Sequence, residues 1–344
     1  MFYVGIDVSK CTLDICLLRD GVRGKVKTRK FKNDGDAAAG VVSWLDKQHC
    51  PPEDTHVIME ATGVYHELTY GLHHAGVRVS LANPHRSREF AHGMGILTKN
   101  DRVDAYMLAC YGALKAPDAW IPPPEAVRLL RALLRRRDTL VADRGRERNR
   151  LEKCRHGFTE GAEAVRASVE AMLRHLDAEI RRLDGQIMAH VQGCPSLKND
   201  LALLTSIKSV GVQTGLHMLV ILRSHQFSRP GQAAAFLGVV PVEKTSGTSV
   251  RGRARMSKIG PPEIRAVLYM AAMCGSRFNP AMKRIFENLL LQGKARMCAI
   301  GALMRRLVHW CWGVLHSQRP FDPEYQRSWH EIRDAEARLC TEGA

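Results

Sequence analysis

The sequence has no Cys-x-x-Cys pair, although it contains ten cysteines. No spacing of cysteine and histidine matches a zinc site, so the cysteines predict reduced thiols, several of them in the core. The chain also lacks any apolar run near the roughly 18 residues that a membrane-spanning helix needs. Its first residues read as a strand and include no basic leader. We therefore expect a cytoplasmic protein that makes no membrane contact.

Acidic residues are scarce relative to basic ones. The 344 residues include 51 Lys and Arg but only 35 Asp and Glu, which gives a net charge of +16. A protein this basic usually binds a polyanion such as nucleic acid. Hydrophobic residues make up 45% of the chain, which is enough for folded cores. At roughly 100–200 residues a domain, the length predicts two domains and a connector.

The first 124 residues alternate between strand and helix patterns. Apolar runs and helical periodicity predict eight elements. They are strands at 2–7, 12–18, 25–31, 56–61 and 77–82, and helices at 36–48, at 64–75 and from about 100. Pro84 is expected to break the chain after the last strand. The order β-β-β-α-β-α-β-α predicts an α/β domain with a mixed sheet over residues 1–124.

A Pro-Pro-Pro run at 122–124 marks the end of this domain, and residues 125–193 predict a helical connector. Between Arg128 and Arg155, 11 Arg and Lys stand against four Asp and Glu. The second helix, at about 161–191, carries apolar residues at the heptad spacing of a coiled coil. These are Leu173, Leu176, Ile180, Leu183 and Ile187. The pattern fits an antiparallel hairpin or an oligomeric coiled coil, and equally a single long helix packed on its own domain.

The remaining chain is predicted to be a mostly helical C-terminal domain over 194–320, followed by a tail at 321–344. Helices are expected at 262–275 and 296–316. A loop at 244–260 contains five cations and no acid, a composition that suits the binding of phosphate. The cations are Lys244, Arg251, Arg253, Arg255 and Lys258. A flexible basic surface loop would have the same composition.

Four acids occupy positions from which they could converge. Asp7 and Glu60 each end a predicted strand, and Asp101 and Asp104 open a helix three residues apart, on one face. Clustered carboxylates repel one another unless cations lie among them, and oxygen ligands suit Mg²⁺ or Mn²⁺. Two such ions could activate the attacking oxygen and stabilise the leaving oxygen of a phosphodiester. In the alternative interpretation Asp101 only caps its helix and Asp104 only balances the helix dipole.

The motif around Asp7, Gly5-Ile6-Asp7-Val8-Ser9-Lys10, also resembles the first phosphate loop of actin-like ATPases. Those proteins carry a second phosphate loop in a duplicated half. Residues 150–344 contain no such copy, which disfavours this alternative.

Several motifs together resemble the DEDD insertion-sequence transposases. They are Gly5-Ile6-Asp7-Val8-Ser9-Lys10, Glu60-Ala61-Thr62-Gly63-Val64-Tyr65, Asn83-Pro84, Phe90-Ala91 and Lys99-Asn100-Asp101-Arg102-Val103-Asp104-Ala105. The resemblance continues through the C-terminal domain. It departs at Asn100, where the family commonly has Thr, but Asn can also cap the helix. The resemblance implies a RuvC-type, ribonuclease-H-like fold for the N-terminal domain.

The resemblance also implies a mechanism and partners. The family has a serine nucleophile in a Ser-Gly-x-Ser-x-Arg-Gly setting, where this sequence has Ser246, with Ser249 the nearest competitor. A guide (bridge) RNA of the element selects donor and target DNA in this family. We therefore expect DNA and guide RNA as partners, and a dimer or tetramer. Candidate nucleic-acid contacts, besides the five loop cations, are Lys99, Arg135, Arg136 and Arg137.

Two other functions stay open at this point. A ribonuclease-H-type nuclease or junction resolvase would use the same carboxylates with water as the nucleophile. A non-enzymatic basic DNA-binding protein would use the carboxylates only structurally. A covalent protein–DNA adduct separates the first from a transposase, and metal-dependent nicking separates the second.

Overall fold

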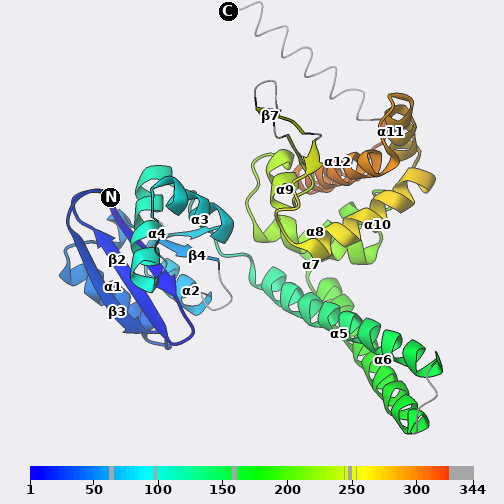
Figure 1. The fold of residues 1–344 in the computed structure, drawn as a ribbon, viewed down its shortest axis with the longest axis horizontal. Coiled ribbons are helices and arrows are strands. Elements are labelled where there is room, and N and C mark those ends of the chain that lie inside the picture. Colours follow the sequence, from blue (N-terminus) through cyan, green and yellow to red (C-terminus); the bar gives the residue numbers. More distant parts are fainter. Residues whose placement is uncertain are drawn as a thin grey trace, which may run out of the picture. The chain divides into compact units, whose positions relative to one another are not determined.

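The fold was analysed in a computed structural model of the chain. The structure describes residues 1–61, 66–96, 98, 100–156, 161–243, 245–246, 250–252 and 254–324. The chain divides into two compact units, Met1–Pro122 and Pro123–Ala344. Figure 1 shows a sheet with helices in the first unit and helices in most of the second. No helix in these ranges is long and apolar enough to cross a membrane.

The first unit contains a five-stranded mixed sheet in the order β3-β2-β1-β4-β5. The strands are β1 (Phe2–Val8), β2 (Thr12–Leu18), β3 (Val26–Lys32), β4 (Thr55–Glu60) and β5 (Arg78–Ala82). β1 to β3 form an antiparallel meander, and β4 and β5 continue the sheet in parallel with β1. This order and these directions are those of a ribonuclease-H-like fold, as the sequence predicted.

Helices cover both faces of this sheet. They are α1 (Ala37–Lys47), the short η1 (Pro52–Asp54), α2 (His66–His74), α3 (Pro84–Gly93) and α4 (Asp101–Lys115). Successive side chains of a strand point to opposite faces. Val4 and Ile6 accordingly pack with α1 and α2 in the larger core cluster. Tyr3 faces the other side, where it packs with residues of α3 and α4.

One helix of this unit was not predicted from the sequence. The break expected at Pro84 is the start of α3, so the predicted element order was wrong by one helix. The Asn83 side chain accepts hydrogen bonds from the backbone N–H groups of His85 and Arg86. A capping asparagine followed by proline at the first helical position is a start signal for a helix, not a stop.

The second unit begins with two antiparallel helices, α5 (Glu125–His156) and α6 (Ala162–Gly193). The predicted heptad seam of α6 packs against α5 of the same chain, where Leu140, Leu176, Ile180 and Leu183 form one buried cluster. Arg137 Nε donates to Asp184 at 2.7 Å, and Arg144 Nη1 donates to Asp177 at 3.0 Å. Three residues of the predicted seam thus pack within the chain, as the hairpin alternative predicted, while Ile187 lies in the bundle core and Leu173 is half-buried.

The rest of the second unit is a helical bundle around one core. Its helices are α7 (Pro195–Thr205), α8 (Val212–Ser224), α9 (Pro230–Phe236), α10 (Pro262–Phe278), α11 (Pro280–Leu291) and α12 (Arg296–Ser317). The helices expected at 262–275 and 296–316 are present as α10 and α12. The nine cysteines in the described ranges are free, and four of them are buried, in line with the expected reduced thiols.

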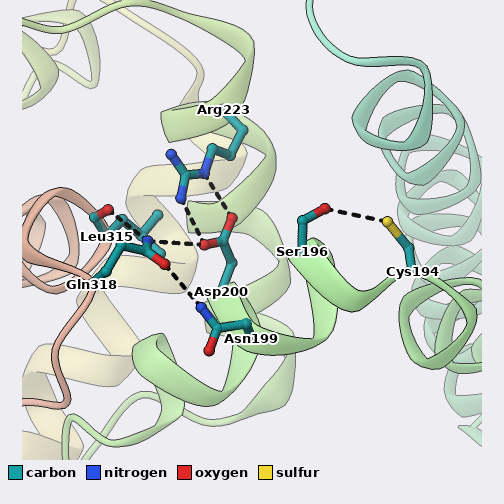
Figure 2. A network of polar contacts seen from close by, with 7 residues as sticks. All are labelled: Cys194, Ser196, Asn199, Asp200, Arg223, Leu315 and Gln318. Carbon is teal, nitrogen blue, oxygen red and sulfur yellow. Dashed lines mark hydrogen bonds and ion pairs between the residues drawn. The ribbon is translucent and has the colours of Figure 1, made fainter.

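An ion pair with a buried carboxylate links α7 to α8, and a hydrogen bond adds the residue after α12 (Figure 2). Arg223 of α8 donates two hydrogen bonds of 2.6 Å to the carboxylate of Asp200 of α7. Gln318, directly after α12, donates to Asp200 at 3.4 Å and accepts from Asn199 at 2.9 Å. Both guanidinium and carboxylate thus have charged partners within the fold.

Candidate active site

Asp7 lies near the end of β1, at the centre of a group of acids. Burial and then the negative charges of Asp104, Asp101, Glu60 and Asp14 raise its pKa to about 6. Burial alone raises the pKa of a carboxyl group, and nearby negative charges raise it further. The structure therefore brings the four predicted acids together, and adds Asp14 as a fifth.

Asp101 and Asp104 reach this group because α4 lies directly on β1. A Cβ added to Gly5 would stand 1.9 Å from the carbonyl oxygen of Ala105, so only glycine permits this approach. The Asn100 side chain accepts a hydrogen bond of 2.9 Å from the N–H of Val103. Asn100 is thus the cap of α4, as predicted for this departure from the family motif. The alternative in which Asp101 is the cap is wrong, and Asp101 is exposed in the first turn.

Glu60 ends β4, and a residue of the helix α3 forms a hydrogen bond with its side chain. The hydroxyl of Ser87 donates a hydrogen bond of 2.5 Å to Glu60 Oε1. Ser87 lies in α3 and is fully buried. Sequence reasoning missed this residue because it missed the helix; the Asn83-Pro84 start signal was the available clue.

Asp14 is the second residue of the site that sequence reasoning missed. Antiparallel pairing of β1 with β2 places it directly opposite Asp7. Its carboxylate lies 3.0 Å from Lys30 Nζ on β3, which neutralises its charge. The register of the predicted hairpin would have revealed the pairing of Asp7 and Asp14.

The donor set at this site is made of carboxylate oxygens, which hard divalent cations such as Mg²⁺ and Mn²⁺ prefer. Among the acids around Asp7, Asp14 forms an ion pair with Lys30. Among the described residues, no three His, Cys, Asp or Glu side chains stand in metal-ligand geometry. The residues fit a divalent cation by their chemistry and neighbourhood.

The basic loop at 244–260 is built from two short antiparallel ribbons. One pairs β6 (Pro241–Val242) with β9 (Arg255–Met256), and the other pairs β7 (Thr245–Ser246) with β8 (Val250–Arg251). We call residues 241–256 the serine ribbon. In Figure 1 it extends from the end of α9. Ser246 lies in β7 opposite Val250, and its side chain is outside the described part of the structure.

The base of the serine ribbon is fixed by two glycines. Gly238 and Gly260 have φ angles of 69° and 128°, which favour glycine. A Cβ on Gly260 would meet the carbonyl oxygen of Phe236 at 2.2 Å. Lys258 N–H donates to Gly238 O at 3.1 Å, closing the base. The ribbon therefore leaves the bundle from a rigid anchor on α9.

The predicted nucleic-acid contacts have different environments. Arg255 and Lys258 at the ribbon base are exposed, as are Arg135 and Arg136 on α5. Arg137 is paired with Asp184, so its charge is already used inside the hairpin. Lys99, Lys244 and Arg253, and the side chain of Arg251, lie outside the described residues.

Comparison with known protein families gives matches in both units. A family model described as a transposase matches residues 4–157. A second, described as the transposase IS116/IS110/IS902 family, matches residues 201–287. The first match contains the carboxylate group, and the second contains the serine ribbon.

Similar proteins include the pilin gene-inverting protein of Moraxella lacunata. It is 30% identical over 327 residues, which cover 93% of this chain and 97% of that protein. A probable family 20 transposase of Pseudomonas aeruginosa is 29% identical over 159 residues, 44% of each chain. A Thermus thermophilus RuvC structure is similar at 17% identity with a TM-score of 0.26, covering 34% of this chain and 95% of that one. With a full-length relative at 30% identity and two transposase models matched, the chain belongs to the IS116/IS110/IS902 family of transposases.

Proposed function

We propose that the protein cuts and rejoins DNA, using a divalent-metal site at Asp7, Glu60, Asp101 and Asp104 and a serine nucleophile, Ser246. The observation that carries the proposal is the neighbourhood of Asp7 on β1, where burial and then the charges of Asp104, Asp101 and Glu60 raise its pKa to about 6. The name of the Moraxella relative describes inversion of a pilin gene, which is a rearrangement of DNA. That name supports recombination over simple DNA binding.

The four carboxylates would hold Mg²⁺ or Mn²⁺. When bound there, the ion would lower the pKa of the attacking oxygen and neutralise charge on the leaving oxygen. Ser87 keeps the Glu60 carboxylate in one orientation through its hydrogen bond. Asn100 keeps the first turn of α4, and with it Asp101 and Asp104, against β1.

Ser246 would attack the phosphorus of a DNA phosphodiester through its Oγ. A serine–phosphate ester forms as the bond from phosphorus to the leaving sugar oxygen breaks, and that oxygen takes a proton. A sugar hydroxyl of the second DNA end then attacks the same phosphorus, loses its proton and releases the serine. The number of phosphodiester bonds is conserved, so rejoining needs no ATP.

A denaturing gel of labelled DNA incubated with protein and Mg²⁺ tests the proposal. Wild type should form a covalent protein–DNA adduct, and Ser246→Ala should form none. Ser249→Ala is the matched control and should keep the adduct. Asp7→Asn should lose both adduct and nicking while still binding DNA. Nicking by Ser246→Ala without an adduct would favour a water-using nuclease, and DNA binding without any metal-dependent nicking would favour a non-enzymatic protein.

Guide RNA and self-association are a further part of the proposal. The chain has a net charge of +16, to which both α5 and the serine ribbon contribute, and no described element is a recognisable major-groove reader. Base pairing by RNA would supply the missing sequence selection. Joining two DNA partners favours at least a dimer. Recombination by RNA-free protein would argue against the guide, and a monomeric active complex in light scattering would argue against assembly.

A further inference from the structure

Two arginines and a histidine lie together on α12. Arg305 and Arg306 precede His309 by four and three residues, so all three side chains leave neighbouring positions of the helix surface. Burial and the charges of both arginines lower the pKa of His309 to about 4. Burial and the charge of Arg305 lower the pKa of Arg306. The three groups are therefore near enough to repel one another.

No acid compensates these charges locally. α12 contains no Asp or Glu, and neither does the segment 225–242, which includes the helix α9 packed beside it. Neither guanidinium takes part in an ion pair within the described ranges. Arg305 Nε and His309 Nε2 are buried atoms that have no hydrogen-bond partner there. A buried donor without a hydrogen-bond partner destabilises a fold, and more so when it is charged.

Arg223 shows how the same bundle treats a structural arginine. Its Nε and Nη2 each donate a hydrogen bond of 2.6 Å to a carboxylate oxygen of Asp200 (Figure 2). Among the described residues, Arg305 and Arg306 form no such ion pair. The two cations are therefore available to an external anion, which the exposed Arg306 side chain could reach first.

The pair lies next to the serine ribbon. A Cβ added to Gly301 of α12 would stand 3.0 Å from Met256 Cε, so β9 rests on the helix at Gly301. Arg305 follows Gly301 by four residues and therefore lies on the same helix face, one turn away. Ser257, the residue after β9, also has a buried hydroxyl without a partner among the described residues.

We propose that Arg305, Arg306 and His309 form a binding site for a backbone phosphate of the nucleic-acid strand that the serine ribbon engages. The phosphodiester supplies the negative charge and the acceptor oxygens that the fold itself does not. Arginine suits this ligand because its planar donors match two phosphate oxygens. The inference rests on the proposed function for the presence of the strand, but not for the presence of an anion site.

Binding of labelled strands by the full-length protein tests the site. We would compare Arg305→Gln/Arg306→Gln with wild type by fluorescence anisotropy, using single-stranded DNA in one arm and RNA of the same sequence in the other. Arg284→Gln on α11 is the matched control, because it removes an exposed arginine of the same unit. The double variant should bind about tenfold more weakly, with a salt slope smaller by about 1–2. The arm that shows the loss identifies the strand, and unchanged binding and slope in both arms overturns the proposal.

A second measurement does not depend on nucleic acid or on catalysis. Thermal melting of each protein is recorded in inorganic phosphate and in chloride at equal ionic strength. Phosphate should raise the Tm of wild type and of Arg284→Gln by more than that of the double variant. Equal gains in all three proteins would contradict the site. If no protein cleaves DNA but the phosphate gain still depends on the arginines, the proposed function fails and the anion site stands. If the double variant does not fold, Arg306→Gln alone serves for both measurements, since Arg306 is the more exposed residue.

Discussion

Ser87 Oγ lies 2.5 Å from Glu60 Oε1 and donates a hydrogen bond to it. The same hydroxyl is 3.1 Å from the carbonyl oxygen of Pro84, in the first turn of α3. Ser87 is fully buried, so no water competes for Glu60 from that side. The orientation of one acid of the candidate active site therefore depends on a helix that follows the next strand.

Replacing Ser87 with alanine should weaken DNA cleavage by about 10–100-fold, the usual effect of losing a partner that orients a metal ligand. The Glu60 carboxylate stays present but no longer has its fixed direction. The expected signature is a higher Mg²⁺ requirement in a titration of cleavage rate. Ser87→Thr keeps the hydroxyl and should restore most of the activity. A wild-type Mg²⁺ dependence for Ser87→Ala would show that Ser87 is only structural.

Asp14→Asn should leave cleavage within a few-fold of wild type. Asp14 faces Asp7 across β1 and β2, but its charge is already balanced by Lys30 at 3.0 Å. Asp7→Asn, its matched partner in the same strand pair, should abolish cleavage. Single-turnover rates of the two variants make the comparison. Equal loss in both would mean that Asp14 belongs to the metal site.

Gly5→Ala should destabilise the first unit by about 1–3 kcal/mol, the usual range for overpacking. The new methyl group would collide with the Ala105 carbonyl and the Ala109 N–H, at 1.9 and 2.4 Å. α4 would have to move away from β1 and would take Asp101 and Asp104 with it, so cleavage should fall as well. Urea denaturation and a cleavage assay measure the two effects. Gly35→Ala is the control, because nothing lies within 4 Å of its new Cβ; a loss equal to that of Gly5→Ala would refute the packing argument.

The sequence predicted the strands of the sheet and the positions of the four acids, because the end of a strand and the start of a helix are visible in the local sequence. Apolar runs define β1 and β4, and Asp7 and Glu60 lie at their ends. Asn100 and the two acids after it indicate the start of α4 by composition alone. The heptad spacing likewise predicted that α6 packs against another helix. The spacing alone could not decide whether that helix belongs to the same chain or to another.

The residues that were missed depend on contacts between distant segments. Ser87 reaches Glu60 over 27 positions of the sequence, and only after α3 is recognised. Asp14 becomes a neighbour of Asp7 only through the strand register. Within the described ranges Arg305 and Arg306 form no ion pair, which depends on how the helices around α12 pack. A basic residue in the sequence gives no indication of whether the fold provides its partner, as the difference between Arg223 and Arg305 shows.

His56 makes the stability of the first unit dependent on pH. It is 1% exposed in β4, and its Nε2 lies 2.7 Å from Ser80 Oγ. Burial, and then the charge of Arg78, lowers its pKa from 6.5 to about 4. Ser80 in turn donates to the carbonyl of Asp118 at 2.7 Å, so its hydroxyl accepts from a neutral imidazole N–H.

Acidification should therefore destabilise this unit through His56. As the pH falls below 6.5, His56 of the unfolded chain binds a proton. In the native state His56 stays neutral until the pH approaches its lowered pKa of about 4. The contribution of His56 to the free energy of unfolding falls by about 2 kcal/mol between about pH 7.5 and pH 5. Asp7 in the same unit acts in the opposite direction, because its pKa is raised to about 6 in the native state. His225 and His309 shift in the same direction in the second unit, so the comparison needs a variant. His56→Asn removes the titration and keeps a polar group for Ser80. Urea denaturation of wild type and His56→Asn at both pH values should show wild type losing about 2 kcal/mol more than the variant, and parallel losses in the two proteins would contradict the assignment to His56.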